Sequence, residues 1–575
     1  MPIEDEGISI LQARAGCIQC NYGSMQKLSG SYIIIGVFLS SFVSLLCYTA
    51  LTLHIVGMDN LAIHLSAGYA YKIILMAMAD IAILGLLLGT AVRLITNPGN
   101  NTRIKHLLPL LAAALIIDAA VLTGVIFLPP IYHDYMHGAK PTAPEELIWS
   151  VGPSLGFTGK GGSGFDVKTR SIWWFDPGTS EEKAYLLYGT RPERNTMRPI
   201  FEIPGGDGKR HEVRFHKLSP STTYYYTIPM LSDEIFSFVT PPDPAQRNDF
   251  HFLNIGDSSN HGHYGHTFFG EISMVARRFY DTSPAEPSFL LLLGDIAHHG
   301  RDLLSWEYFF LNGKYLLSRY PTITVPGNHE LYDDHGGNLH YFFRQPRYFS
   351  FDYENAHFLI INTFDGFGGI NGITGKDQYN FIRDDLRANS GKKWIVVGMH
   401  VPPISTGDFG MNELLKKQYL DLFSRYRVDL VLMGHDHHYE AFWIDRDTDW
   451  NGTLYVINGG GGSRLDHYIM TRKNRQWKTW VHDRNSDYGL YQHDAITEKY
   501  HLYGELSWGF LDVHITRNSL TTTYHRWLSM ERFLSITGQD LESWTFFPFD
   551  RDTWDKNLLS DTEEVHRLVK TRSFP

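Results

Sequence analysis

Seven short apolar runs recur between residues 250 and 457, and helical patterns separate several of them. The runs are 250–255, 289–293, 322–325, 358–361, 394–397, 430–433 and 454–457. Runs that are apolar without alternation are typical of strands buried on both faces of a sheet. The stretches 268–280, 377–388 and 414–426 predict helices between them. This order predicts a layered α/β domain, for which we take the bounds 246–530.

Five of the runs are followed by side chains that can bind metal ions. In chain order these residues are Asp257, Asp295, Asn328, His329, His400, His435 and His437. Ligand sites of α/β sheets gather at the carboxyl ends of strands, so we expect these side chains to converge. Two divalent cations a few ångströms apart need a bridging carboxylate with oxygen and imidazole ligands, and Asp295 is the candidate bridge.

A glycine precedes three of these residues, namely Asp257, Asp295 and His435. We expect each glycine to let the backbone turn sharply at its strand end. One Gly-Asp pair after a strand is commonly an ordinary turn. Five such motifs in order, each after an apolar run, predict a metal site instead.

Residues 143–241 have a different pattern. Strand-like runs at 170–175, 184–188, 211–216, 223–228 and 235–239 are separated by Gly, Pro and Ser, which predicts an antiparallel β-sandwich. No side chain in this segment suggests chemistry, so we expect a spacer that packs against the next domain. Residues 531–575, rich in aromatic and acidic side chains, form a predicted C-terminal tail that either covers a groove or packs on the sandwich.

Three apolar stretches, 32–57, 73–92 and 107–128, are each long enough to cross a bilayer. They predict three transmembrane helices within 29–131, after a cytoplasmic segment at 1–28. The loop between the second and third stretches carries Arg93, Arg103 and Lys105, so it is predicted to be cytoplasmic. The chain is therefore expected to be a multi-pass membrane protein with its catalytic domain on the extracytoplasmic side and the lipid bilayer as a partner.

Composition excludes little else. The formal net charge of −11 disfavours nucleic acid as a partner, because no basic excess would neutralise phosphates. Cys17 and Cys20 have the spacing of a redox or zinc half-site, but no second pair accompanies them. Asp80 and Asp118 lie within predicted membrane helices, where each either forms a hydrogen bond between helices or lines an ion path.

The order Gly-Asp, Gly-Asp-x-x, Gly-Asn-His-Glu, His and Gly-His-x-His resembles the calcineurin-like metallophosphoesterase superfamily. The preceding segment, with Tyr188-Gly189 and the runs 211–213, 218–226 and 236–240, is similar to the fibronectin-III-like domain of purple acid phosphatases. Asn458 with the glycines 459–462, and the run 508–512, resemble the closing strands of that family. The resemblance covers about residues 143–528. It implies a layered β-sandwich flanked by helices, preceded by the fibronectin-III-like sandwich.

The resemblance also implies two adjacent metal sites that share one carboxylate. The ligands of the first would be Asp257, Asp295, His298 and His437. The ligands of the second would be Asp295, Asn328, His400 and His435. His329 would lie over the leaving group, and Asp295 and Asn328 join it as the predicted catalytic residues.

His298 is the main departure from the family pattern. Purple acid phosphatases have a tyrosine three residues after the bridging Asp, and it colours a ferric site. Other superfamily members have a His two residues after the first Asp, where this chain has Ser259. His298 either supplies the missing imidazole or is an ordinary loop residue. With no tyrosine, two divalent ions (Fe, Zn or Mn) are expected. His261, His263 and His266 either contact phosphate or are solvated.

The function implied is hydrolysis of phosphomonoesters by attack of metal-bound hydroxide, with His329 protonating the leaving oxygen. The same site could hydrolyse phosphodiesters. A membrane-tethered binding or sensor module with a dead catalytic fold would require lost ligands, and none of the motif residues beyond the tyrosine position is lost. A transport-linked protein would rest on Asp80 and Asp118 alone.

Overall fold

The computed structural model describes residues 151–572, with gaps at 160–164, 177–183, 203–208, 216, 242–248, 260–266, 284, 332–335, 365–374, 408, 467–469, 474–475, 480–498 and 538–561. The predicted cytoplasmic segment and membrane helices lie outside the described residues, as do the tail aromatics Trp544, Phe546, Phe547, Phe549 and Trp554. In the part that is described, no helix has the length and apolar character needed to cross a membrane.

The first described part consists of two antiparallel sheets. One has the order β1-β2-β5, with β1 at Val151–Gly159, β2 at Phe165–Phe175 and β5 at Arg210–Arg214. The other has the order β4-β3-β6-β7, with β4 at Arg198–Phe201, β3 at Tyr185–Gly189, β6 at Thr223–Thr227 and β7 at Phe236–Val239. Alternate side chains from both sheets form one core that includes Trp174, Val213 and Tyr226. Each of the five expected strand-like runs overlaps one of these strands.

A six-stranded sheet follows, with the order β10-β9-β8-β20-β21-β22. Its bounds are β8 Phe250–Ile255, β9 Pro287–Leu292, β10 Thr322–Thr324, β20 Ser507–Ile515, β21 Ser519–Ser529 and β22 Glu563–Thr571. The strands β8, β9 and β10 are parallel, whereas β20 pairs antiparallel with β8. Strand β22 lies in the segment expected to be a tail, and it pairs with β21 along its length.

The second large sheet has seven strands in the order β11-β12-β13-β14-β16-β15-β19. Its bounds are β11 Phe349–Tyr353, β12 Ala356–Ile360, β13 Trp394–Gly398, β14 Leu430–Met433, β15 Tyr439–Ile444, β16 Thr453–Asn458 and β19 His501–Glu505. The central strands β12, β13, β14 and β16 are parallel. A separate hairpin pairs β17 (Met470–Lys473) with β18 (Gln476–Thr479).

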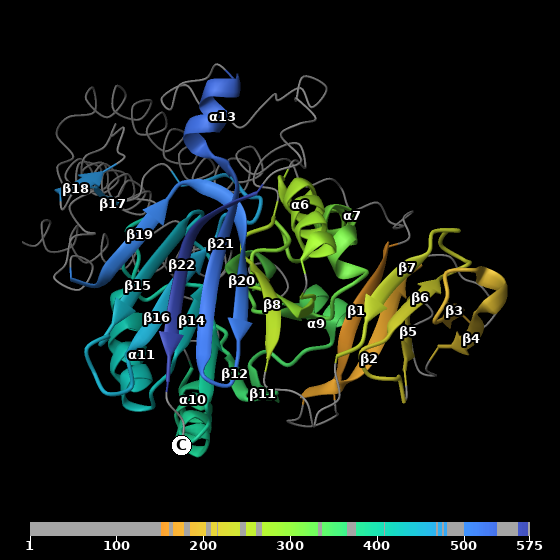
Figure 1. Cartoon of the computed structure of the whole chain (residues 1–575), viewed down its shortest axis with the longest axis horizontal. Coiled ribbons are helices and arrows are strands. Elements are labelled where there is room, and N and C mark those ends of the chain that lie inside the picture. The colour runs from red at the N-terminus through yellow and green to blue at the C-terminus, as the bar shows by residue number, and fades with distance from the viewer. Residues whose placement is uncertain are drawn as a thin grey trace, which may run out of the picture. The chain divides into compact units, whose positions relative to one another are not determined.

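The two large sheets pack face to face through a core that includes Phe252, Phe289, Phe358 and Leu430. Helices α6 (Phe269–Thr282) and α7 (Leu303–Leu317) cover the outer face of the six-stranded sheet. Helices α10 (Lys376–Asn389) and α11 (Glu413–Arg425) cover the outer face of the seven-stranded sheet, on the opposite side of the layers in Figure 1. Shorter helices are α8 (Asn328–Leu331), α9 (Gly337–Phe343) and α13 (Met530–Thr537). The layered α/β architecture is therefore present.

The β-sandwich contacts the α/β layers directly. Trp173 of β2 lies in the core under α7, with its ring stacked on Phe342 at 5.8 Å. The Arg210 Nε donates a 3.0 Å hydrogen bond to the Phe342 carbonyl, and the Tyr226 hydroxyl donates one of 2.6 Å to the Ser318 carbonyl. Buried aromatic contacts and satisfied hydrogen bonds together stabilise the packing of the β-sandwich on the α/β layers. Residues 151–241 and the α/β layers thus share part of one core.

Candidate metal centre

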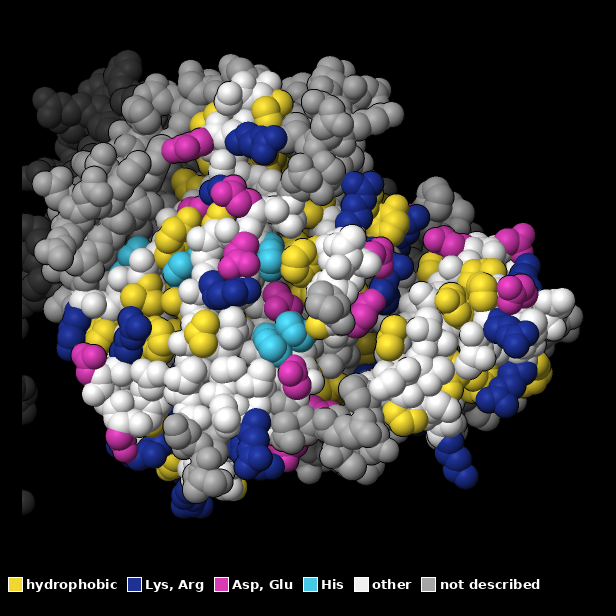
Figure 2. All heavy atoms as spheres, viewed as in Figure 1, with side chains coloured by type: hydrophobic (Ala, Val, Ile, Leu, Met, Phe, Trp, Pro, Cys, Tyr) yellow, Lys and Arg dark blue, Asp and Glu magenta, His cyan; other side chains and the backbone are white. Residues whose placement is uncertain are grey.

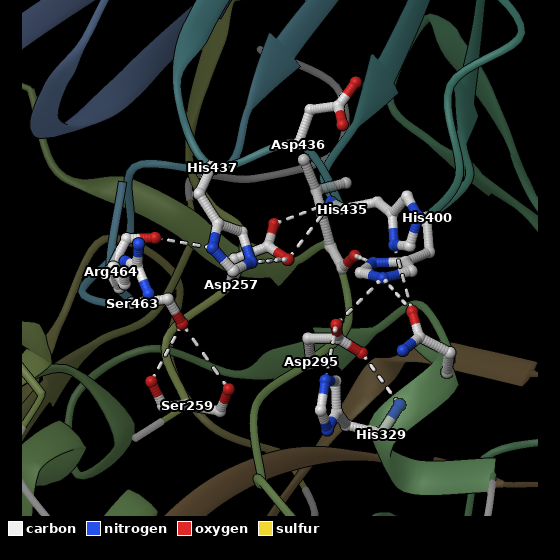
Figure 3. Close-up of polar contacts among 12 residues, drawn as sticks. Asp257, Ser259, Asp295, His329, His400, His435, Asp436, His437, Ser463 and Arg464 are labelled. Atoms are coloured by element: carbon white, nitrogen blue, oxygen red, sulfur yellow. Dashed lines mark hydrogen bonds and ion pairs between the residues drawn. The ribbon is translucent and has the colours of Figure 1, made fainter. Parts of the chain in front are cut away.

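The predicted metal-binding residues meet at the carboxyl ends of the parallel strands of both large sheets. Asp257 follows β8, Asp295 follows β9, and Asn328 begins α8 just beyond β10. His400 follows β13, and His435 and His437 follow β14. Figure 3 shows Asp295 with Asp257 and His437 to one side and His400 and His435 to the other. Strands from both sheets therefore contribute to one site.

Two groups of potential ligands share Asp295. In one group, a carboxylate oxygen or ring nitrogen from each of Asp295, His400 and His435 lies within 4.8 Å of the others. The second group joins Asp257, Asp295 and His437 in the same way. A carboxylate common to two groups of ligands is the arrangement that a pair of divalent cations requires. The donor set, two carboxylates with three imidazoles, suits Fe, Zn or Mn.

Backbone carbonyls fix which ring nitrogens face the centre. The Nδ1 of His400 donates to the Leu293 carbonyl at 2.6 Å, and the Nδ1 of His437 donates to the Arg464 carbonyl at 2.6 Å. The Nε2 atom of His400 then lies 3.2 Å from Asp295 Oδ2, and the Nε2 atom of His437 lies 3.5 Å from Asp257 Oδ1. Metal-bound histidines usually donate their second ring N–H to a carbonyl or carboxylate, so both rings are oriented as ligands.

Asn328 adds a ligand to the group that contains His400 and His435. Its Oδ1 lies 3.1 Å from His400 Nε2 and 3.0 Å from His435 Nδ1. The backbone N–H of His329 donates to Asp295 Oδ1 at 2.9 Å, which couples the start of α8 to the shared carboxylate. The amide oxygen of Asn328 is thus directed at the same point as the two imidazoles.

The backbone is strained at the ligands themselves. Asp257, Asp295 and His435 have φ values of 58°, 50° and 71°, in the left-handed region that non-glycine residues rarely adopt. Of the glycines that precede them, Gly294 also has positive φ, at 88°. Gly434 is needed for a different reason, since a Cβ there would collide with Asp257 Oδ2. The sharp turns are present. Of the three preceding glycines, only Gly294 itself adopts a backbone conformation that favours glycine.

Burial and mutual contact shift the pKa values of these groups. Burial opposes the charged form of His400, but the adjacent Asp295 and Asp257 carboxylates raise its pKa to about 10. His437 is raised to a pKa of about 9, against its burial, by Asp257. Burial and the neighbouring His400 lower the pKa of His435 to about 3. A divalent cation would compete with protons for these same nitrogens.

Comparison with known proteins agrees with this geometry. Residues 247–439 match the family model described as calcineurin-like phosphoesterase. Residues 247–439 are thus similar to a calcineurin-like metallophosphoesterase domain.

Its relatives include purple acid phosphatases. Purple acid phosphatase 21 of Arabidopsis thaliana is 29% identical over 305 residues, which are 48% of this chain and 65% of that protein. Probable inactive purple acid phosphatase 1 of the same plant is 23% identical over 340 residues, covering 50% of this chain and 54% of that protein. The match spans less than two thirds of either relative. A solved purple acid phosphatase from yellow lupin seeds has a TM-score of 0.49 at 17% identity, covering 66% of this chain and 72% of that chain.

His329 lies at the edge of the metallophosphoesterase centre. Its Nδ1 donates to the His298 carbonyl at 2.7 Å, so Nε2 is the nitrogen that faces Asp295 Oδ2, at 3.8 Å. Burial lowers the pKa of His329, although Asp295 acts in the opposite direction. The side chain is 15% exposed, so Nε2 lies between the buried carboxylate and the solvent side.

The structure places His298 beside His329. The His298 side chain is buried, and its ring stacks on that of His329 with centroids 5.0 Å apart. Among the described residues, neither group of ligands includes His298. Its role as a metal ligand stays a prediction.

Ser259 occupies the position where other superfamily members have a histidine. Its side chain is buried, and its carbonyl accepts a 2.8 Å hydrogen bond from the Ser463 hydroxyl (Figure 3). His261, His263 and His266, which were considered as contacts to phosphate or as solvated residues, lie outside the described residues.

Glu330 has a role that the sequence reasoning missed. Its carboxylate accepts backbone N–H groups from Asp295, Ile296, Ala297 and Gly327 at 2.8–3.0 Å. Burial and the nearby Asp295 charge raise the pKa of Glu330 to about 8, whereas these N–H donors favour the ionised form. Glu330 therefore links the turn at Asp295 to the turn that leads into Asn328. Its place directly after His329 was the available sequence indication.

A buried network beneath the His435–His437 loop was also missed. Asp466 accepts the His437 backbone N–H at 3.1 Å and the His438 Nδ1–H at 2.7 Å. Glu440 lies 3.3 Å from His438 Nε2 and 3.0 Å from His501 Nε2. His438 and Glu440 come from one segment, whereas Asp466 and His501 lie in two others, so no local pattern in the sequence joins all four. The network fixes the loop that carries two of the candidate ligands.

Proposed function

We propose that this chain is a phosphoric ester hydrolase that cleaves phosphomonoesters with two divalent metal ions. The ions would be held by Asp257, Asp295, Asn328, His400, His435 and His437. One observation carries the proposal: the buried Asp295 belongs to both groups of ligands. A single structural ion would need only one such group. Additional support comes from the metallophosphoesterase family match and the purple acid phosphatase relatives.

The residues around the centre have distinct tasks in this proposal. When bound, the two cations would acidify a water molecule and neutralise phosphoryl oxygens. Asp295 would fix their separation, and Glu330 keeps Asp295 in its strained turn through four backbone N–H groups. As water adds to phosphorus and the P–O bond to the leaving group breaks, that oxygen needs a proton. His329 would provide it from Nε2, because Nδ1 donates to the His298 carbonyl.

The experiment that tests the proposal is metal analysis of the purified chain together with rates on phenyl phosphate and on bis(p-nitrophenyl) phosphate. At least two metal equivalents, two of which are lost in Asp295→Ala, and a higher kcat/KM for the monoester are expected. A reversed preference would favour phosphodiester hydrolysis. Two bound metals with no hydrolysis of either compound would favour a binding or sensor module, a possibility raised by the relative described as probably inactive.

We expect the metal-loaded protein to be nearly colourless, because position 298 carries no tyrosine to give phenolate-to-iron charge transfer. If His298 is a ligand, His298→Ala should weaken binding of one metal ion, and His298→Tyr loaded with iron should gain a visible band. The measurements are a visible spectrum and metal content, with His340→Ala as the control at an exposed histidine. Unchanged metal content in His298→Ala would show that His298 only supports His329.

We also propose that residues 29–131 anchor the chain in a membrane with the hydrolase domain on the extracytoplasmic side. The basis is the length of the three apolar stretches and the positive charge of the loop between the second and third. Protease added to intact cells should remove the domain, and a reporter fused after Tyr132 should report an outside location. Protection from protease until the cells are permeabilised would reverse the orientation.

A further inference from the structure

At the other end of the six-stranded sheet, two Asp-x-His sequences lie on neighbouring strands. Asp249 and His251 stand at the start of β8, and Asp512 and His514 stand near the end of β20. The antiparallel register sets His251 directly opposite His514. Because alternate residues of a strand face the same side, all four side chains lie on one face of the sheet.

The four side chains are in close contact. The His251 and His514 rings are stacked, with centroids 3.9 Å apart and an interplanar angle of 9°. His514 Nε2 lies 2.6 Å from Asp249 Oδ1, and His251 Nδ1 lies 3.0 Å and 3.1 Å from the two Asp512 oxygens. A ligand atom from each of Asp249, His251 and His514 lies within 4.8 Å of the others.

Asp512 is itself held in place. The hydroxyl of Tyr280, a buried residue near the end of α6, donates a 2.7 Å hydrogen bond to Asp512 Oδ1. Asp512 in turn fixes the orientation of the His251 ring through Nδ1. A carboxylate that orients a histidine from behind is typical of metal sites, because it fixes the tautomer and makes the ligand more basic.

The cluster is open to solvent. The side chains of Asp249, His514 and His251 are 69%, 30% and 20% exposed. Figure 2 shows histidine side chains with acidic side chains beside them on the surface over the β8–β20 region. A hydrated ion could therefore reach the ligands without any movement of the backbone.

We propose that Asp249, His251 and His514 form a third metal site, which binds a divalent transition metal ion of the Zn²⁺ class. Two imidazoles and one carboxylate, with solvent as a fourth ligand, are a common donor set for Zn²⁺. His251 and Asp257 are six residues apart along β8 and its end, which at strand rise separates this site from the candidate catalytic centre by about 20 Å. The bound ion would join the start of β8 to the end of β20. This third metal site is independent of the proposed hydrolase activity.

Ion pairing between the same side chains is the competing explanation, because each imidazole lies against a carboxylate. In the stacked arrangement the lone pairs of the two rings are nearly parallel, so the rings would rotate about their side-chain bonds for one nitrogen of each to face a single ion. The two explanations differ in whether zinc binds.

The test is zinc binding by full-length variants, measured by equilibrium dialysis with elemental analysis after chelator treatment. In the Asp295→Ala chain, which is expected to lose the catalytic pair, one zinc equivalent should remain. Adding His514→Gln should lower the affinity for that zinc ion by more than ~100-fold. Adding Asp512→Asn should lower the affinity by only about 10–100-fold, as for a residue that orients a ligand. His340→Gln is the matched control and should leave the zinc in place.

If His514→Gln folds poorly, thermal unfolding of the other variants provides a second test of the zinc site. Zinc should raise the Tm of the Asp295→Ala chain, because an ion that binds only the folded state stabilises it. Asp249→Asn, a change at an exposed side chain, should remove most of that rise. The proposal is overturned if the zinc equivalent or the Tm rise persists in Asp249→Asn and His514→Gln. Loss of the third equivalent with two catalytic equivalents intact in the wild-type background would separate this site from the hydrolase centre.

Discussion

Asp295→Ala is expected to remove both catalytic metal ions and with them all measurable phosphomonoester hydrolysis. The carboxylate is shared by two groups of ligands, so its loss leaves each ion without the atom that connects it to the other. The remaining side chains would also be left as buried imidazoles with one carboxylate, Asp257, to balance them. Metal analysis and rates on phenyl phosphate measure the outcome.

Two further variants make this result specific. Asp295→Asn keeps an oxygen that can accept the His329 backbone N–H but removes the charge, so it should bind metal far more weakly than the wild type. Asp384→Ala, which removes an exposed carboxylate on α10, should keep both metals and the full rate, because surface pairs contribute little. Two metal equivalents with a near-normal rate in Asp295→Ala would refute the bridging assignment.

The sequence predicted the site well because of where its ligands stand along the chain. Asp257, Asp295 and His400 each follow a run of apolar residues, and such runs are buried strands in a layered α/β protein. Parallel strands bring their carboxyl ends to one edge. Local patterns of this kind therefore carry information about contacts between residues more than a hundred positions apart.

The antiparallel strands of the two large sheets were harder to predict. Strands β15, β20 and β21 alternate or mix polar and apolar residues, and their pairing joins distant segments. Strand β22 is far in sequence from its partner β21, and it contains several charged residues. One of them, Lys570, is nevertheless buried beside Asp429. Such a contact has no local pattern, because Asp429 and Lys570 lie far apart in the sequence.

Helix α7 was missed for a different reason. It contacts α6, β1 and the core, so its apolar residues are not restricted to one face. Asp302 does cap it, with its carboxylate accepting the Leu304 and Ser305 backbone N–H groups. That capping pattern was present in the sequence, but without helical periodicity it could not be separated from a loop.

His329→Ala is expected to slow phosphomonoester hydrolysis by roughly 10²–10⁴-fold, the usual effect of losing a general acid, while both metal ions stay bound. The metal content should persist because the His329 ring is in neither group of ligands. Its Nε2 is the only ring nitrogen able to donate toward substrate, since Nδ1 donates to the His298 carbonyl. His340→Ala, at an exposed histidine, is the control and should keep the full rate.

The dependence on the leaving group decides whether His329 acts as an acid or only as a contact. A leaving group of low pKa, such as p-nitrophenolate, departs without a proton, so His329→Ala should cost it much less than it costs an alkyl phosphate. A residue that only binds the phosphoryl group would slow both compounds equally, because that group is the same in each. Equal losses would therefore remove the general-acid role from His329 and leave it a binding role. A loss that grows with leaving-group pKa would assign the transferred proton to Nε2.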